Sequence, residues 1–187
     1  FNAPVLLGEN GRFLQTHEPY RHEYNKAIYL VRDVRDVVIS EYYFSKRLQF
    51  HQGDFASFFN KFIHGQANRY GFWADHVNSW LDAWEQDDKK ILLIRFEEMR
   101  QDPKDTLLKM LSFLEVERSP AIVQQAVDNN TVKRMQEKED KSAKFRNNAD
   151  NIRFVNKGSI GGGQQFLSTE QLAHIEQCTQ KARKRLA

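Results

Sequence analysis

Two short, almost entirely apolar segments constrain the fold of this chain more than any other feature. One covers residues 26–32 and the other covers residues 90–96, and each has the length of a single strand. Near-continuous apolar runs of this length are typical of parallel strands that are covered on both faces. A shorter segment, 12–16, is also predicted to be a buried strand, and it ends before Pro19, where proline closes regular structure.

Helical patterns alternate with these strands. A helix is predicted over residues 36–46, directly after the strand at 26–32. The starts of further helices are marked by N-cap residues, by a capping box or by aromatic residues at helical spacing: Asp54, Trp73, Asp102 with Pro103, and Ser168 with Gln171. Strands that alternate with helices predict an α/β fold of packed layers around a parallel sheet.

Composition narrows the class of protein. The chain has 187 residues, of which 40% are hydrophobic and 28% are charged, so we expect one globular domain over 1–187. Its longest apolar runs are far shorter than the roughly 18 residues of a membrane span. A single cysteine, Cys178, excludes an internal disulfide framework and a cysteine-based zinc site, and it fits the cytoplasm. The net charge of +3 allows an anionic ligand without requiring nucleic acid.

The segment from Val31 to Ser40 is the first candidate for chemistry. A strand delivers Arg32 to its carboxyl end and the chain then enters a helix, which is where open α/β sheets bind ligands. The planar guanidinium of Arg32 and the hydroxyl of Ser40 suit phosphate oxygens. The same pattern also fits an ordinary loop with surface salt bridges.

Two further segments carry candidate residues. His17 follows the segment at 12–16 and is placed like a catalytic base, although the local pattern by itself favours a surface histidine in a turn. Trp73 and His76 begin the aromatic helix and can border a pocket, whereas its later tryptophans belong in the core. The phenylalanine-rich helix at 55–62 either lines an apolar pocket or fills the core.

The stretch from Lys157 to Gly163 is rich in glycine. Glycines let the backbone approach an anion closely, so that N–H groups can cradle a phosphate. It is not a Walker loop, because no Lys-Ser or Lys-Thr pair follows the glycines. A flexible linker is the alternative. The polar segment before it, 136–151, is predicted to be a mobile surface loop.

Taken together, these segments resemble the PAPS-dependent sulfotransferases. The resemblance begins at about Phe13 and covers most of the chain. It rests on these blocks: Thr16-His17-Glu18-Pro19, Tyr29 to Tyr43, Gly71 to Trp80, Ile94 to Met99 with Asp102-Pro103, and Phe154 to Gly161. It implies a P-loop NTPase-like, three-layer α/β fold with a central parallel sheet.

The resemblance also implies roles for individual residues. The reaction would move a sulfuryl group from PAPS to a hydroxyl or amine and leave PAP, without a metal. His17 would be the general base, and Trp73 and His76 would border the acceptor. The implied nucleotide-binding residues are Arg32, Ser40, Lys157 and Gly158 at the 3′-phosphate, and Phe96 and Thr131 elsewhere on the nucleotide.

Several positions depart from the family pattern. Asn156 stands where the family has an arginine, which removes a charge from the phosphate site, and Arg153 is a candidate substitute. Gln15 replaces a lysine, and Lys133 stands where a stacking phenylalanine is usual. The family's loop for the 5′-phosphosulfate is absent from the sequence, and the chain does not begin with Met. We therefore expect a longer protein, of which this chain is a part.

Two other functions remain open at this stage. One is a P-loop nucleotide kinase, and the other is a sulfotransferase-like domain that has lost catalysis and serves in binding. Asn156, Gln15 and Lys133 favour the second. The expected partner is a small-molecule, lipid or carbohydrate acceptor, with a homodimer as an option. A nucleic-acid partner is not expected, since acidic residues balance the basic ones.

Overall fold

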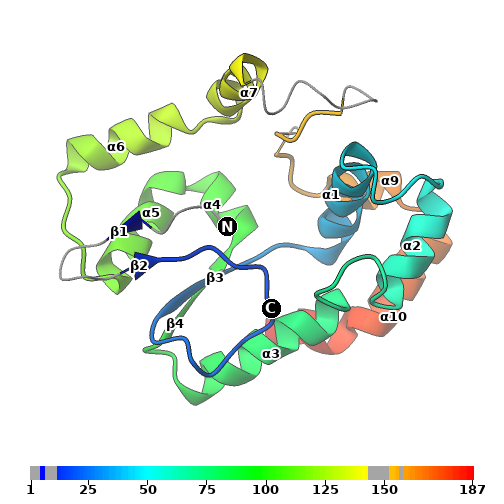
Figure 1. The fold of residues 1–187 in the computed structure, drawn as a ribbon. Coiled ribbons are helices and arrows are strands. Elements are labelled where there is room, and N and C mark those ends of the chain that lie inside the picture. Colours follow the sequence, from blue (N-terminus) through cyan, green and yellow to red (C-terminus); the bar gives the residue numbers. More distant parts are fainter. Residues whose placement is uncertain (1–4, 7–11, 143–151, 156–157) are drawn as a thin grey trace.

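A parallel pair of strands lies at the centre of the computed structural model, which describes residues 5–6, 12–142, 152–155 and 158–187. Strand β3 (Ala27–Val31) pairs with β4 (Ile91–Arg95), with Ala27 opposite Ile91 and Val31 opposite Arg95. The two apolar segments therefore form the predicted parallel strands (Figure 1).

The third predicted strand is wrong in its length and surroundings. Only Arg12–Phe13 forms a strand, β2, which pairs antiparallel with β1 (Val5–Leu6) in a separate small sheet. Phe13 is 47% exposed and Leu14 is 69% exposed. The segment was expected to be buried because of its apolar residues, but it lies outside the parallel sheet and is not covered on both faces.

The predicted helices are present, although the first begins at Val34, two residues before the expected start at 36. Asp33 caps α1 (Val34–Arg47) and Asp54 caps α2 (Phe55–Ile63), each by accepting a bond from a backbone N–H of the first turn. Helix α4 (Phe96–Gln101) follows β4 directly. The remaining predicted starts are also confirmed: α3 at Trp73–Gln86, α5 at Pro103–Phe113 after Asp102, and α10 at Thr169–Arg185 with its capping box.

Four short helices were not predicted. They are α4, which follows β4, and also α6 (Pro120–Asn129), α7 (Val132–Lys141) and α9 (Gly162–Phe166). Helix α7 corrects the expected loop at 136–151, because residues 136–141 form its C-terminal half. Its sequence is highly polar, yet Glu139 is buried and accepts bonds from the backbone N–H groups of Phe154 and Val155. The rest of the expected loop, 143–151, lies outside the described residues.

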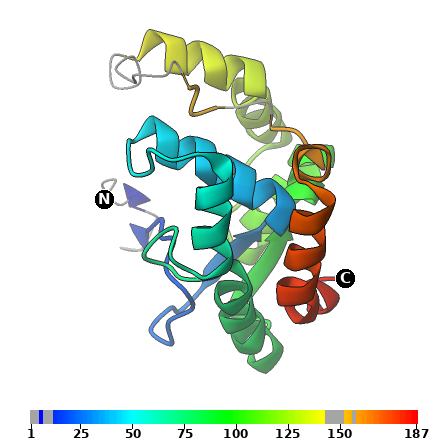
Figure 2. The ribbon, with the colours of Figure 1, turned by 90° about the vertical axis from the view of Figure 1, so that its right-hand side faces the viewer.

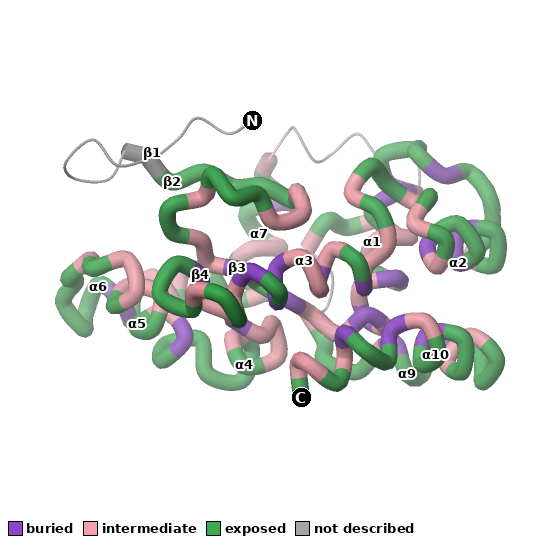
Figure 3. The backbone as a smooth tube through the Cα atoms, turned by 90° about the horizontal axis from the view of Figure 1, so that it is seen from below, coloured by how far each residue is buried: buried purple, intermediate pink, exposed green. Residues whose placement is uncertain are grey.

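The helices divide into two groups around the strands. Helices α5 and α6 lie at one end of the molecule, and α1, α2, α9 and α10 lie at the other, with β3, β4 and α3 between them (Figures 1 and 3). Helices α6 and α7 lie on the opposite side of the strands from α3 (Figure 2).

Two apolar clusters hold this arrangement together. One joins the sheet to α3 and is centred on Val77, Trp80 and Leu81. The other joins α1, α2 and α10, and the phenylalanines of α2 pack into it. Phe58, Phe59 and Phe62 are all buried, so this helix contributes to the core.

A buried carboxylate attaches the glycine-rich segment to α1. Asp36 is 4% exposed, and its oxygens accept bonds from the N–H of Gly161 at 3.0 Å and of Gly163 at 2.7 Å. The backbone of Gly163 runs so close to α1 that a Cβ there would overlap the carbonyl of Arg35. Glycine is therefore required at 163 for steric reasons.

Gly163→Ala is expected to lower the free energy of unfolding by about 1–3 kcal/mol, because a methyl group must push the segment away from α1. Thermal and urea unfolding followed by circular dichroism measure this change. The matched control is Gly162→Ala, whose Cβ would meet only the flexible Ser159 hydroxyl at 3.1 Å. Equal stability of the two variants would contradict the close approach at 163.

Candidate functional site

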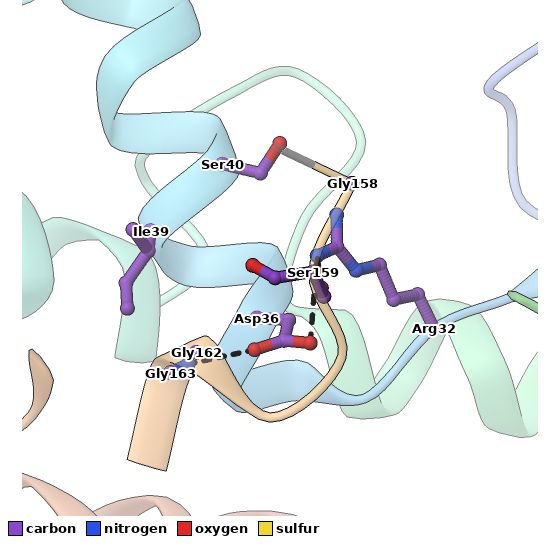
Figure 4. A pocket seen from close by; sticks show the side chains of 8 residues that line it. All are labelled: Arg32, Asp36, Ile39, Ser40, Gly158, Ser159, Gly162 and Gly163. Carbon is purple, nitrogen blue, oxygen red and sulfur yellow. Dashed lines mark hydrogen bonds and ion pairs between the residues drawn. The ribbon is translucent and has the colours of Figure 1, made fainter. Parts of the chain in front are cut away.

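A small cavity lies at the carboxyl end of β3, where α1 begins. Its volume is about 70 Å³. It is lined by Arg32, which follows β3, and by residues of α1 and of the glycine-rich segment: Asp36, Ile39, Ser40, Gly158, Ser159, Gly162 and Gly163. Figure 4 shows that the predicted residues Arg32, Ser40 and Gly158 surround one space, although they are distant in the sequence.

Arg32 is held from several sides. Its Nη2 donates to the carbonyl of Ser159 at 3.0 Å and lies 3.4 Å from a carboxylate oxygen of Asp36. Its guanidinium carbon lies 4.4 Å from the centre of the Phe96 ring, in a cation–π contact. Its Nε is buried and finds no hydrogen-bond partner within the described part of the chain. Buried donors are normally paired, so this atom marks a place for an acceptor.

Gly158 brings a third element to the cavity. It adopts a left-handed conformation with φ of 58°, and a Cβ there would lie 3.1 Å from the side chain of Val132. Val132 is the first residue of α7, and Thr131 caps that helix. The N-terminus of α7 therefore lies beside the glycine-rich segment, which places Thr131 in the vicinity of the site. The predicted Lys157 lies outside the described residues.

Arg153 does not replace the charge that is lost at Asn156. Its guanidinium pairs with the carboxylate of Asp140 at 3.0 Å, its side chain is 48% exposed, and it does not line the cavity. This correction follows from α7, whose Asp140 competes for the arginine. Sequence spacing could not reveal this partner, because α7 was expected to be a loop.

A larger cavity of about 370 Å³ lies at the carboxyl ends of both parallel strands. Trp73, Arg32 and Arg95 are among its lining residues, so the predicted Trp73 does border a cavity. Arg35 forms two bonds with Asp33, at 2.8 and 2.6 Å. Although burial opposes it, these bonds hold the pKa of Asp33 below its usual value.

The segment that carries His17 is held by α3. His76 bonds to the carbonyl oxygen of His17 at 3.2 Å, and the indole of Trp80 donates to the carbonyl of Glu18 at 3.3 Å. Ser79 accepts a bond from the backbone N–H of Tyr20 at 3.1 Å. The His17 side chain itself is exposed and lines neither of the two cavities.

The hydrogen bonds of His76 fix its tautomer. A carbonyl only accepts, so Nε2 must donate to His17, and the unprotonated Nδ1 then accepts from the hydroxyl of Tyr29 at 3.1 Å. Burial lowers the pKa of His76 and keeps the ring neutral. Both ring nitrogens are engaged inside the protein, so the predicted role of His76 in acceptor binding stays a prediction.

The family model for the sulfotransferase domain matches residues 4–187. The chain belongs to this family. Sulfotransferase 1E1 of Rattus norvegicus is 33% identical over 137 residues, which are 68% of this chain and 45% of that protein. Cytosolic sulfotransferase 7 of Arabidopsis thaliana is 25% identical over 189 residues, which are 96% of this chain and 58% of that protein.

Solved structures agree with this assignment. The crystal structure of mouse sulfotransferase SULT7A1 complexed with PAP superposes with a TM-score of 0.73 at 25% identity, over 89% of this chain and 63% of that one. A structure of retinol dehydratase with retinol and PAP has a TM-score of 0.72 at 22% identity, over 84% of this chain and 47% of that one. The predicted sulfotransferase fold is therefore confirmed. The chain spans about half the length of the curated relatives described above.

Several residues of this candidate site were not predicted. Asp36 lies in the segment whose alternative interpretation is a loop with surface salt bridges, yet it is buried and accepts bonds from the glycine-rich segment. Arg100 was not singled out at all, and its Nε donates to the carbonyl of Gly158 at 3.2 Å. No local sequence signal marks either contact, although Arg32 and Asp36 are four residues apart in the sequence.

Among the described residues, no group of three or more metal-ligating side chains gathers, and no helix is long and apolar enough to cross a membrane.

The neutral state of His76 makes the stability of this sulfotransferase domain depend on pH. Its pKa is lowered in the folded state, whereas an unfolded histidine titrates near about 6.5. Below that pH the unfolded chain takes up a proton that the native ring does not, so stability falls. His76→Gln is expected to flatten this fall between pH 8 and 5.5, as measured by urea unfolding.

His22→Gln is the matched control, because that side chain is 91% exposed. It should leave the pH dependence close to that of the wild type. An unchanged pH dependence in His76→Gln would show that the ring is not held neutral by the fold.

Proposed function

We propose that this domain takes part in sulfuryl transfer from PAPS to an acceptor hydroxyl or amine. The observation that carries the proposal is the convergence of Arg32, Ser40 and Gly158 on one cavity at the carboxyl end of β3. Membership of the sulfotransferase family supports it, and so does the PAP that is bound to the similar mouse sulfotransferase. The family match favours this function over a nucleotide kinase.

The cavity suits the 3′-phosphate of the nucleotide. Arg32 offers a planar fork of donors with one buried N–H still unpaired, and Ser40 adds a hydroxyl. Lys157 is proposed from the sequence to add a charge. Phe96 and Thr131 are proposed to border the rest of the nucleotide, because Phe96 packs on Arg32 and Thr131 is adjacent to Val132, which approaches Gly158.

His17 is the proposed general base. It would accept the proton of the acceptor hydroxyl while the acceptor oxygen forms a bond to sulfur. The bond between sulfur and the bridging phosphate oxygen breaks, and PAP leaves with that electron pair. Positioned donors stabilise the negative charge that develops on the leaving phosphate. Trp73 is proposed to border the acceptor, which would be a small molecule, a lipid or a carbohydrate, and the proposed location is the cytoplasm.

Arg32→Ala is expected to weaken PAP binding by at least about tenfold, because a charge-assisted contact to phosphate is lost. Isothermal titration calorimetry of the chain measures this, and PAP but not ATP should raise its Tm. The control is Arg21→Ala, since Arg21 is exposed and pairs with Glu23. Normal PAP binding by Arg32→Ala would sink the assignment of the phosphate site.

His17→Ala is expected to lower kcat by about 100-fold or more, which is the usual contribution of a general base. The measurement is sulfuryl transfer from PAPS in a form of the protein with measurable turnover. PAP affinity should stay unchanged, because His17 lines neither cavity. His64→Ala is the control, since that ring is bonded to the carbonyl of Asn60 in its own helix turn. Retained turnover in His17→Ala would rule out this residue as the base.

A further inference from the structure

The proposed phosphate cavity lacks net positive charge in its described residues. Arg32 is compensated by Asp36, which lies 3.4 Å away and is almost fully buried. Ser40 and Gly158 are neutral. A phosphate monoester carries a charge of about −1.5 to −2 at neutral pH, and a poorly solvated anion is stable only when it is paired. Lys157, already proposed to add one positive charge, would leave part of the phosphate charge uncompensated, so the proposed site needs a further cation.

Three other arginines, on α1 or before the glycine-rich segment, are already paired with carboxylates. Arg35 forms two bonds with Asp33, and Arg153 pairs with Asp140. Arg47, at the end of α1, lies 3.9 Å from a carboxylate oxygen of Glu139. Each of these guanidinium groups would have to break its ion pair with a carboxylate before it could bind a phosphate.

Arg100 differs from these arginines. Within the part of the chain that the structure describes, it pairs with no carboxylate, and its hydrogen bond runs from Nε to the carbonyl of Gly158 at 3.2 Å. Its guanidinium carbon would lie 3.5 Å from a Cβ at Gly158. The charge of Arg100 therefore lies directly against a residue that lines the cavity.

Arg100 and Arg32 approach the same stretch of backbone. Arg32 donates to the carbonyl of Ser159, and Arg100 donates to the preceding carbonyl, that of Gly158. Phe96 and Arg100 are four residues apart on α4 and so share one face of that helix. Because the Phe96 ring packs on Arg32, this face is turned toward the site.

We propose that Arg100 is a second guanidinium for the 3′-phosphate, which supplies the charge that the Arg32–Asp36 pair does not. The inference rests on the proposed function and assigns a binding residue within it. Arg100 is exposed, so its terminal N–H groups can turn to the phosphate without leaving an ion pair. The left-handed glycine at 158 lets the backbone lie close to this guanidinium.

The test compares PAP affinities of chain variants by titration calorimetry. Arg100→Gln removes the charge and is expected to weaken PAP binding by roughly tenfold. Arg100→Lys keeps the charge but loses the Nε bond, and it should stay within about threefold of the wild type. Arg118→Gln is the matched control, because Arg118 is exposed and its guanidinium donates to the neighbouring carbonyl of Glu117.

Two further measurements distinguish the effect of the Arg100 charge from an effect on the conformation of the glycine-rich segment. The loss in Arg100→Gln should shrink at about 0.5 M salt, where the Debye length falls to a few ångströms. Its affinity for 5′-AMP, which lacks the 3′-phosphate, should not fall. An equal loss for both nucleotides would move Arg100 to another part of the ligand and overturn the assignment.

The outcomes distinguish the two proposals. Absence of PAP binding by the wild-type chain would overturn the proposed function, and the role of Arg100 with it. Wild-type binding with Arg100→Gln equal to Arg118→Gln would overturn only the role of Arg100. If Arg100→Lys were as weak as Arg100→Gln, the residue would act by holding the Gly158 carbonyl, and the charge assignment would be wrong.

Discussion

The buried carboxylate of Asp36 is the interaction on which the candidate site depends. A buried charge is costly unless it is paired and hydrogen-bonded, and Asp36 meets both conditions. It accepts two backbone N–H groups of the glycine-rich segment and faces the guanidinium of Arg32. One side chain thus decides where the segment crosses α1 and where Arg32 points. The steric requirement for Gly163 follows from the same close approach.

Strand β3 connects the two halves of the site. Tyr29, within the strand, bonds to His76 and stacks on Trp80 with ring centres 4.7 Å apart, and both partners hold the segment of His17. Arg32 follows the end of the same strand and enters the phosphate cavity. The candidate base and the candidate phosphate ligand are therefore positioned from one rigid element. This coupling favours a fixed distance between them, which group transfer requires.

Local signals predicted much of the fold, whereas long-range contacts escaped them. Neighbouring residues are sufficient to predict the strands at 26–32 and 90–96 and the helix caps at Asp54 and Ser168. The structure contains all of these elements. Convergence of Arg32 with Gly158 followed from a family resemblance, since the two are far apart in sequence. The contacts of Asp36, Arg100 and Arg153 could not be predicted, because each is made with a partner on another helix or loop.

The contacts of Arg32 suggest how ligand and protein share its donors under the proposed function. Its Nη2 is shared between the neutral carbonyl of Ser159 and the carboxylate of Asp36, while its Nε remains unpaired. A phosphate is a stronger acceptor than a carbonyl, so it can replace Ser159 and satisfy Nε without displacing Asp36. The glycine-rich segment would then stay in place through the bonds of Gly161 and Gly163 to Asp36, because the phosphate would not compete for these N–H groups. Nucleotide binding can in this way use Arg32 fully while the backbone around it stays fixed.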